Sequence, residues 1–145
     1  MPHRRPDGKA VSPVRLVLAD DHEDVLCELR ALLNSEFEVV DSVNDGSALI
    51  DAARKWKPDV VISDLEMPGV SGLDACRQIL LRGHCSASII LTMHKEAQFV
   101  KDALRTGIRG YVLKVDAGEE LVSAVRGVRD GSVYLSRGVL RKRMD

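Results

Sequence analysis

Several polar side chains that could do chemistry come directly after apolar runs of the chain. They are three carboxylates, a hydroxyl and an amine, at Asp20, Asp21, Asp64, Thr92 and Lys114. If the fold brings the carboxylates within a few ångströms, their like charges raise one another's pKa values. A divalent cation relieves this conflict, and Mg²⁺ favours oxygen ligands from one or two carboxylates, from water and from phosphate. The pattern therefore predicts a magnesium site, with Lys114 offsetting part of the remaining negative charge.

Asp64 is the carboxylate that we expect to react. A carboxylate beside bound Mg²⁺ can attack phosphorus and form an aspartyl-phosphate, and phosphoryl transfer needs mainly positioning and charge neutralisation. Asp64 ends an apolar run, where a strand end would present it beside Asp20 and Asp21. Asp21 would bind the metal directly, and Asp20 could bind it through water. The backbone carbonyl of Glu66, two residues past Asp64, could supply another oxygen.

Each of these residues also has an ordinary structural interpretation when taken alone. Asp64 could cap the turn that follows it, and Asp21 could be the N-cap of a helix. Thr92 could be a β-branched strand residue, and Lys114 a solvated lysine. Their combination favours the chemical interpretation, in which Thr92 donates a hydrogen bond to the phosphoryl group and Lys114 pairs with it.

The elements that must position these side chains alternate along the chain. Short runs rich in Val, Ile and Leu predict five strands, at residues 15–19, 37–43, 59–64, 87–92 and 110–114. The segments between them have helical spacing and end near glycines, as after Leu104 at Gly107. This alternation predicts an α/β fold, a parallel sheet with helices on both faces. Among the topologies that right-handed crossovers allow, we choose the flavodoxin-like order 2-1-3-4-5, in which ligands bind where strands 1 and 3 end.

Composition and charge exclude several classes of protein. The 145 residues are 45% hydrophobic and 30% charged, which is typical of one soluble globular domain. The net charge of −1 divides into +2 for residues 1–13, −6 for 14–136 and +3 for 137–145. An acidic body with only two Phe, two Tyr and one Trp does not predict a nucleic-acid-binding face. No apolar run is long enough for a membrane helix, and we expect a cytoplasmic protein.

The cysteines and two histidines have unremarkable interpretations. Cys27, Cys76 and Cys85 are odd in number and lack C-x-x-C spacing, so we expect buried, reduced thiols rather than zinc or disulfides. His22 and His94 flank the predicted pocket. A metal role is one interpretation of both, but because a hard Mg²⁺ site prefers oxygen ligands we interpret both as surface loop residues.

Four motifs together resemble a known family. The segments are LADDHED, ISDLEMPGVSGLD, IILTMH and GYVLK. In this order and spacing they resemble the receiver domain of bacterial two-component response regulators, over about residues 14–136. The closing VRDGSVYLS is similar to the NarL/FixJ (LuxR-type) subfamily, whose members usually continue into a LuxR-type helix-turn-helix. Residues 1–13 are then expected to be a flexible tail, and 137–145 a linker or the start of a linker helix, too short for a DNA-binding domain.

The resemblance implies a CheY-like fold with the same strand order, and a switch rather than an enzyme. A sensor histidine kinase would donate the phosphoryl group to Asp64, with Mg²⁺ at Asp20, Asp21 and Asp64. Thr92 would then move toward the phosphoryl group, and Tyr111, otherwise half-buried, would rotate inward. That rearranges the face of the fourth helix, fifth strand and fifth helix, and often favours a homodimer. Self-phosphorylation and slow self-dephosphorylation are the only reactions expected, and the output would be transcription regulation.

Some features depart from the family or leave alternatives open. Many relatives have proline where Val115 follows Lys114, which leaves the geometry of that loop open. Glu66 and His94, each two residues past a site residue, could edge the path of hydrolytic water and tune the phosphoryl lifetime. The alternatives are a stand-alone receiver acting by protein contact, a receiver that has lost phosphorylation, a phosphohydrolase and a flavodoxin-like cofactor binder. A phosphohydrolase typically has a second Asp where this chain has Glu66, and a phosphate-binding loop would not carry the acidic ADDHED.

Overall fold

The structure, a computed structural model, describes residues 13–144 of the chain, with side chains to Leu140. The tail predicted for residues 1–13 lies, apart from Pro13, outside the described residues. No helix in the described range is long and apolar enough to cross a lipid bilayer.

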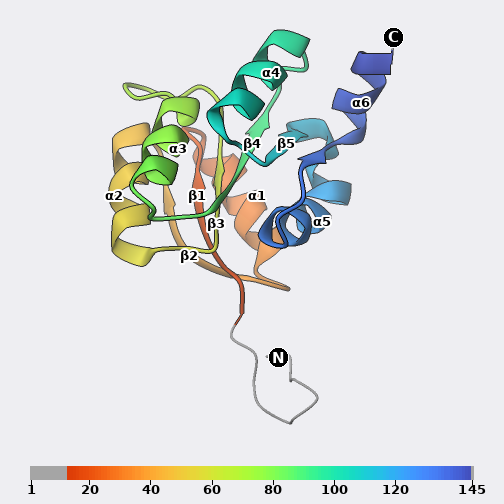
Figure 1. Cartoon of the computed structure of the whole chain (residues 1–145). Helices are drawn as coiled ribbons and strands as arrows, with labels where there is room; N and C mark the ends of the chain where they lie inside the picture. Colours follow the sequence, from red (N-terminus) through yellow and green to blue (C-terminus); the bar gives the residue numbers. More distant parts are fainter. Residues whose placement is uncertain (1–12, 145) are drawn as a thin grey trace.

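A single parallel sheet forms the centre of the molecule (Figure 1). Its strands are β1 (Arg15–Ala19), β2 (Glu38–Val43), β3 (Val60–Ser63), β4 (Ala87–Thr92), β5 (Gly110–Leu113) and the short β6 (Tyr134–Leu135). They lie in the order β2-β1-β3-β4-β5-β6, and every neighbouring pair is parallel. The predicted order 2-1-3-4-5 is confirmed, and β6 is an additional strand that the sequence pattern did not indicate.

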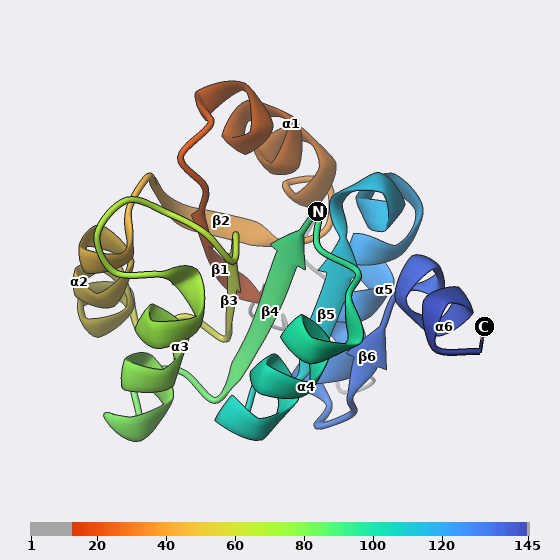
Figure 2. The ribbon, with the colours of Figure 1, turned by 90° about the horizontal axis from the view of Figure 1, so that it is seen from above.

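Helices cover both faces of the sheet, as predicted. They are α1 (Glu23–Leu33), α2 (Gly46–Trp56), α3 (Gly72–Leu81), α4 (Ala97–Thr106), α5 (Ala117–Arg129) and α6 (Arg137–Met144), with a 3₁₀ turn at Lys114–Asp116. Helices α1 and α5 pack on one face and α2, α3 and α4 on the other (Figure 2). Alternate residues of β1 divide between them, because Leu16 and Leu18 face α1 and α5 whereas Val17 and Ala19 face α2 and α3.

Side-chain caps and one glycine set several helix ends. Asp45 accepts a hydrogen bond from Ala48 N (2.8 Å) at the start of α2. Gly107, with φ of 103°, ends α4 in the left-handed conformation that a side chain disfavours. The alternative interpretation of Asp21 as the N-cap of α1 is not what the structure shows. His22 precedes the helix without a side-chain cap, because the Asp21 carboxylate turns to within 3.1 Å of His22 Nδ1 instead.

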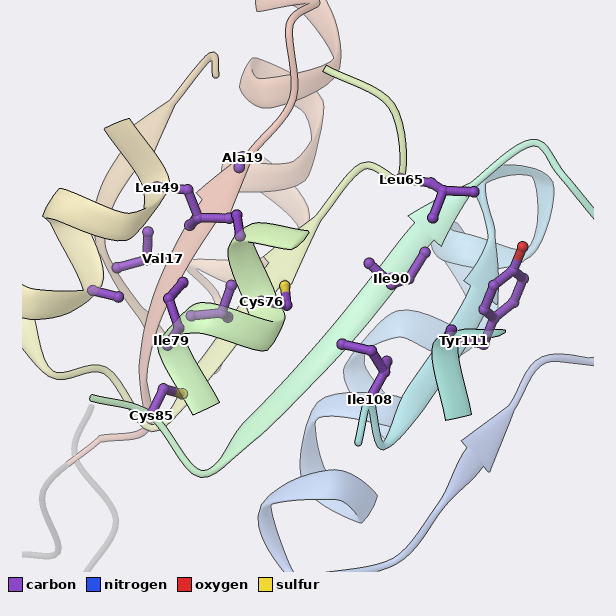
Figure 3. Close-up of a cluster of buried hydrophobic side chains, with 14 of the residues drawn as sticks. Val17, Ala19, Leu49, Leu65, Cys76, Ile79, Cys85, Ile90, Ile108 and Tyr111 are labelled. Atoms are coloured by element: carbon purple, nitrogen blue, oxygen red, sulfur yellow. The ribbon is translucent and has the colours of Figure 1, made fainter. Parts of the chain in front are cut away.

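All three cysteines are free, but they differ in exposure. Cys76 and Cys85 lie in the core beneath α3, as predicted (Figure 3). Burial raises the pKa of Cys76 to about 12, so its thiol stays neutral. Cys27 is exposed on α1, and the prediction that it is buried is wrong because its helix turns that position to solvent.

The C-terminal segment, residues 134–140, is attached to the edge of the sheet. Ser136 donates its amide to Tyr111 O (3.1 Å), and its hydroxyl accepts from Leu113 N (3.0 Å). Val139 is fully buried against the core on the α4 side. Gly138 makes the close approach possible, since a Cβ there would lie 2.5 Å from Leu113 Cδ1. Helix α6 is therefore held in contact with β5 at its first turn.

Two carboxylates of α5 and the turn before it hold the start of α6. Glu120 accepts hydrogen bonds from Tyr134 Oη (2.9 Å) and from Arg137 N (3.1 and 3.2 Å). Asp116 Oδ2 accepts one from Gly138 N (2.9 Å). The first amides of a helix have no partner within the helix, so these carboxylates satisfy donors that would otherwise be unpaired.

Candidate functional site

The predicted site residues gather at the carboxyl ends of the strands. Strand pairing sets this directly, because Ala19 lies opposite Ser63 and Thr92 opposite Leu113. The residue that follows each strand is thereby carried to the same edge of the sheet. A pocket of about 320 Å³ opens there. It is lined by Asp21, His22, Asp64, Glu66, Met67, Pro68, Thr92, Met93, His94 and Lys114.

The backbone places the two buried carboxylates side by side. Asp64 N donates to Ala19 O (2.9 Å), which continues the pairing of β1 and β3 into the site. Gly72, at the start of α3, packs so closely on the Asp64 carbonyl that a Cβ there would lie 1.7 Å from its oxygen. This contact holds the start of α3 against the backbone of Asp64, and the Asp64 side chain lines the pocket.

Four neighbouring side chains could together hold a metal ion. Asp20, Asp21, His22 and Asp64 each offer a ligand atom, and these atoms lie within 4.8 Å of one another. Asp20 is only 1% exposed and Asp64 9%. The sequence predicted the three carboxylates at this position and placed His22 beside the pocket, where it was interpreted as a surface loop residue.

Lys114 lies between the two buried carboxylates. Its Nζ is 2.9 Å from Asp20 Oδ2 and 3.3 Å from Asp64 Oδ2. Burial alone would lower the pKa of Lys114, but its contacts with Asp20 and Asp64 outweigh that effect and the pKa is raised. Burial raises the pKa of Asp64 more than the charge of Lys114 lowers it. One amine therefore does not fully compensate the two carboxylates.

Asp20 Oδ2 has an ion pair but no hydrogen bond within the described residues. Asp20 Oδ2 is buried, and no described group forms a hydrogen bond with it, since the approach of Lys114 is an ion pair without hydrogen-bond geometry. A buried carboxylate oxygen without a hydrogen bond costs free energy. Clustered carboxylate oxygens are the donor set that hard dications prefer. The residues present therefore fit a divalent cation.

Thr92 and Tyr111 meet at the backbone of His94. Thr92 is buried, and its Oγ1 accepts a hydrogen bond from His94 N (3.1 Å). The Tyr111 hydroxyl donates to His94 O (2.5 Å). Tyr111 is fully buried and points into the core beside α4, so the expectation of a half-buried ring is wrong (Figure 3). The ring packs in the cluster that contains Val100 and Ala103, and burial raises the pKa of its hydroxyl.

Two loops meet across the mouth of the pocket through Glu66 and His94. His94 Nε2 is 3.0 Å from Glu66 Oε1, and His94 Nδ1 is 3.8 Å from Glu96 Oε2. The His94 ring also packs on Phe99, with centroids 4.7 Å apart. The contacts join the loop after β3 to the loop after β4.

Val115 lies in the 3₁₀ turn that follows β5. There is no cis peptide bond among residues 13–144, so the Lys114–Val115 bond is trans. The Val115 side chain is exposed beside the pocket. Replacing the family's proline therefore leaves Lys114 directed at Asp20 and Asp64.

Comparisons with known proteins agree with this geometry. Residues 16–126 match the family model described as the response regulator receiver domain. The oxygen regulatory protein NreC of Staphylococcus carnosus is 38% identical over 125 residues, which are 84% of this chain and 58% of that protein. The chain thus spans little more than half the length of this curated relative.

Solved structures show the same likeness. A LuxR-family two-component response regulator from Aurantimonas sp. SI85-9A1 superposes with a TM-score of 0.83 and 30% identity, over 92% of this chain and all of that one. A structure of two RcsB dimers bound to two parallel DNAs gives a TM-score of 0.78 and 29% identity, over 90% of this chain and 67% of that one. The resemblance drawn from the sequence motifs is confirmed: the chain belongs to the response regulator receiver domain family, and its relatives are regulators of the NarL/LuxR type.

Proposed function

We propose that the chain is a phosphorylation-controlled switch in which Asp64 accepts a phosphoryl group from the phosphohistidine of a sensor histidine kinase. The observation that carries the proposal is the position of Asp64, which faces a pocket with a carboxylate pair on one side and Lys114 Nζ 3.3 Å away. A receiver domain is not in general an enzyme, and we expect no reaction beyond self-phosphorylation and slow self-dephosphorylation.

The transfer is a single exchange at phosphorus. A carboxylate oxygen of Asp64 forms the new P–O bond while the P–N bond to the kinase imidazole breaks, and the imidazole leaves with the electron pair and takes up a proton. Asp20, Asp21, Asp64 and the Glu66 carbonyl would hold Mg²⁺, which when bound supplies charge neutralisation for the phosphoryl oxygens. Lys114 Nζ already lies 3.3 Å from Asp64 Oδ2 and can pair with the phosphoryl oxygens.

The switch would use the Thr92 and Tyr111 contacts. A phosphoryl group on Asp64 attracts the Thr92 hydroxyl, which at present accepts from His94 N. Tyr111 donates to the carbonyl of the same His94. Movement of Thr92 would therefore release the His94 amide and shift the backbone that holds Tyr111 inward. Phosphorylation would bias states that already exist, and the inward Tyr111 is one of them.

The output follows from the relatives rather than from this chain. We propose transcription regulation in the cytoplasm through a LuxR-type helix-turn-helix that lies outside the chain, with a homodimer favoured by phosphorylation, as suggested by the RcsB dimers on DNA. The domain boundaries that we propose are those of the sequence analysis, a receiver at 14–136 followed by a linker helix. A stand-alone receiver acting by protein contact remains the alternative.

One assay tests the proposal. Incubation with Mg²⁺ and acetyl phosphate should add one acid-labile phosphoryl group, detected by intact mass, and Asp64→Asn should add none. Asp51→Asn, on the exposed side of α2, is the matched control and should behave as the wild type. Sustained hydrolysis of a phosphate ester would instead support a phosphohydrolase, and labelling that persists in Asp64→Asn would overturn the assignment of Asp64.

Glu66 and His94 are proposed to tune the phosphoryl lifetime. Their 3.0 Å contact spans the mouth of the pocket, so breaking it opens a path for water toward Asp64. We expect His94→Ala to speed dephosphorylation several-fold, about 1 kcal/mol in the barrier, as measured by loss of the labelled species after removal of acetyl phosphate. Glu96→Gln, which alters only the 3.8 Å contact, is the control. An unchanged rate in His94→Ala would remove this role.

A further inference from the structure

The His22 imidazole stands in the acid cluster rather than beside it. Its Nδ1 lies 3.0 Å from Asp20 Oδ1 and 3.1 Å from Asp21 Oδ1. The backbone amide of His22 also donates to Asp20 Oδ1 (2.9 Å), which fixes the carboxylate relative to the ring. The side chain is 61% exposed, yet its nitrogen faces the carboxylates.

These spacings match those between neighbouring ligands of one cation. With metal–ligand distances of about 2.1 Å, adjacent ligands of an octahedral ion lie about 3.0 Å apart. The two distances from His22 Nδ1 to the carboxylate oxygens equal that edge. A second observation concerns Asp20, which is 99% buried and whose Oδ2 has no hydrogen bond from any described group. That oxygen lies 2.9 Å from Lys114 Nζ, which it shares with Asp64, so two buried carboxylates have one cationic side chain between them.

We infer that His22 supplies, through Nδ1, a nitrogen ligand to the cation held by Asp20, Asp21 and Asp64, so that the site favours transition-metal dications over Mg²⁺. The inference rests on the proposed function only in requiring that a cation binds at these carboxylates. It revises the interpretation of His22 as a surface loop residue.

The chemical consequence is a difference in selectivity. Carboxylate and water ligands suit Mg²⁺ and Mn²⁺ alike, whereas imidazole adds affinity for Mn²⁺, Co²⁺ and Ni²⁺ and little for Mg²⁺. Losing the nitrogen should therefore weaken Co²⁺ or Ni²⁺ binding by about tenfold, the scale of effect that ligand-shell changes have on metal affinity. Mg²⁺ affinity should stay within about twofold of the wild type, because Mg²⁺ can replace the nitrogen with water.

The competing interpretation is that His22 only donates a hydrogen bond to the carboxylates. His22→Asn separates the two, because asparagine can still hydrogen-bond to Asp20 but does not provide an imidazole nitrogen. His94→Ala is the matched control, since His94 is the other imidazole that lines the pocket.

The test uses the full chain in slightly alkaline buffer, so that protons do not compete with the metal for the His22 nitrogen. Calorimetric titrations with Mg²⁺ and Ni²⁺ give the selectivity ratio, and pulsed electron paramagnetic resonance of the Mn²⁺-loaded chain reports any directly bound ¹⁴N. We expect ¹⁴N coupling that excess Mg²⁺ displaces, that persists in His94→Ala and that disappears in both His22→Asn and His22→Ala, together with the tenfold fall in Ni²⁺ affinity.

Three results would overturn the inference. One is a bound Mn²⁺ without nitrogen coupling, and another is a His22→Asn variant that keeps the wild-type Ni²⁺ to Mg²⁺ ratio. Either leaves the proposed function intact, since a cation still binds and acetyl phosphate still labels Asp64. A chain that binds no cation at all removes the inference, and the acetyl phosphate assay then shows separately whether the proposed function fails with it.

Discussion

Two buried carboxylates in this molecule are stabilised in different ways. Glu120, 8% exposed in α5, accepts hydrogen bonds from Tyr134 Oη and from the amide of Arg137. Asp20, 1% exposed after β1, keeps one oxygen without any hydrogen bond from the described residues and shares a single lysine with Asp64. Glu120 thus has hydrogen-bond donors of its own, whereas Asp20 depends for charge compensation on a lysine that it shares with a second carboxylate.

The difference distinguishes structural from functional burial. Taking a carboxylate out of water costs several kcal/mol unless hydrogen bonds and charges replace the lost solvation. At Glu120 the protein supplies the replacement and gains a docked α6. At the strand ends one lysine serves two carboxylates, and the negative charge that remains can be balanced by a cation. Functional sites commonly carry such a cost in stability.

The largest expected effect is on stability, when Glu120 is replaced. Glu120→Ala should lower the free energy of unfolding by about 2–4 kcal/mol, because it leaves the Tyr134 hydroxyl and the Arg137 amide without their partner. Urea denaturation followed by circular dichroism measures it. Glu119→Ala, one residue earlier on the same helix and exposed, should change stability little. Equal losses in the two variants would erase the contrast between the two regions.

A change of opposite sign is expected at Asp20, which shares Lys114 with Asp64. Asp20→Asn removes a buried negative charge beside Asp64 and leaves Lys114 paired with Asp64, so the free energy of unfolding in EDTA should rise by about 1 kcal/mol. The gain should come with weaker cation binding, measured by titration of the same variant. A destabilised Asp20→Asn that still binds the cation normally would show that Asp20 is structural, like Glu120.

The smallest effect is a pH dependence that belongs to Asp64. Burial raises the pKa of Asp64 above its ordinary 3.8, so between these values the native state binds more protons than the unfolded chain. Its contribution to the free energy of unfolding therefore falls as pH rises from about 3.8 through the raised pKa, and the loss is complete above it. The free energy of unfolding of the wild type minus that of Asp64→Asn, both measured by urea denaturation in EDTA, should decrease as the pH rises across this range. A difference that rises with pH would mean that Lys114 more than compensates the burial.

The sequence was sufficient for most of the architecture because the signals were redundant. The apolar residues of β1, β3 and β4 are buried, and alternation with helices leaves few topologies. Once the strand order is set, the positions of Asp20, Asp64, Thr92 and Lys114 follow, since each sits at or just past a strand end. Strand β6 was missed because Tyr134–Leu135 is too short to give a periodic signal.

The errors concern side chains whose direction depends on tertiary contacts. Asp21 could cap a helix or face a site, and local sequence does not decide between them; the clustered charges turn it to His22. The side chains of Tyr111 and Val112 face opposite sides of the sheet, as strand geometry requires. How far the Tyr111 ring is buried depends on α4 and on the carbonyl of His94. Cys27 is a small apolar residue on the solvent side of an amphipathic helix, and its residue type alone does not predict that exposure.

The way in which α6 is attached has a mechanical consequence. Ser136 is bonded to the backbone of Tyr111 and Leu113, and Gly138 to Asp116 just past Lys114, so the base of α6 is clamped to the strand that carries the proposed switch residues. Eight helical residues span about 12 Å, so a tilt of about 10° at the clamp would move the far end by about 2 Å. A slight rotation of β5 beside the site would therefore displace the far end of α6.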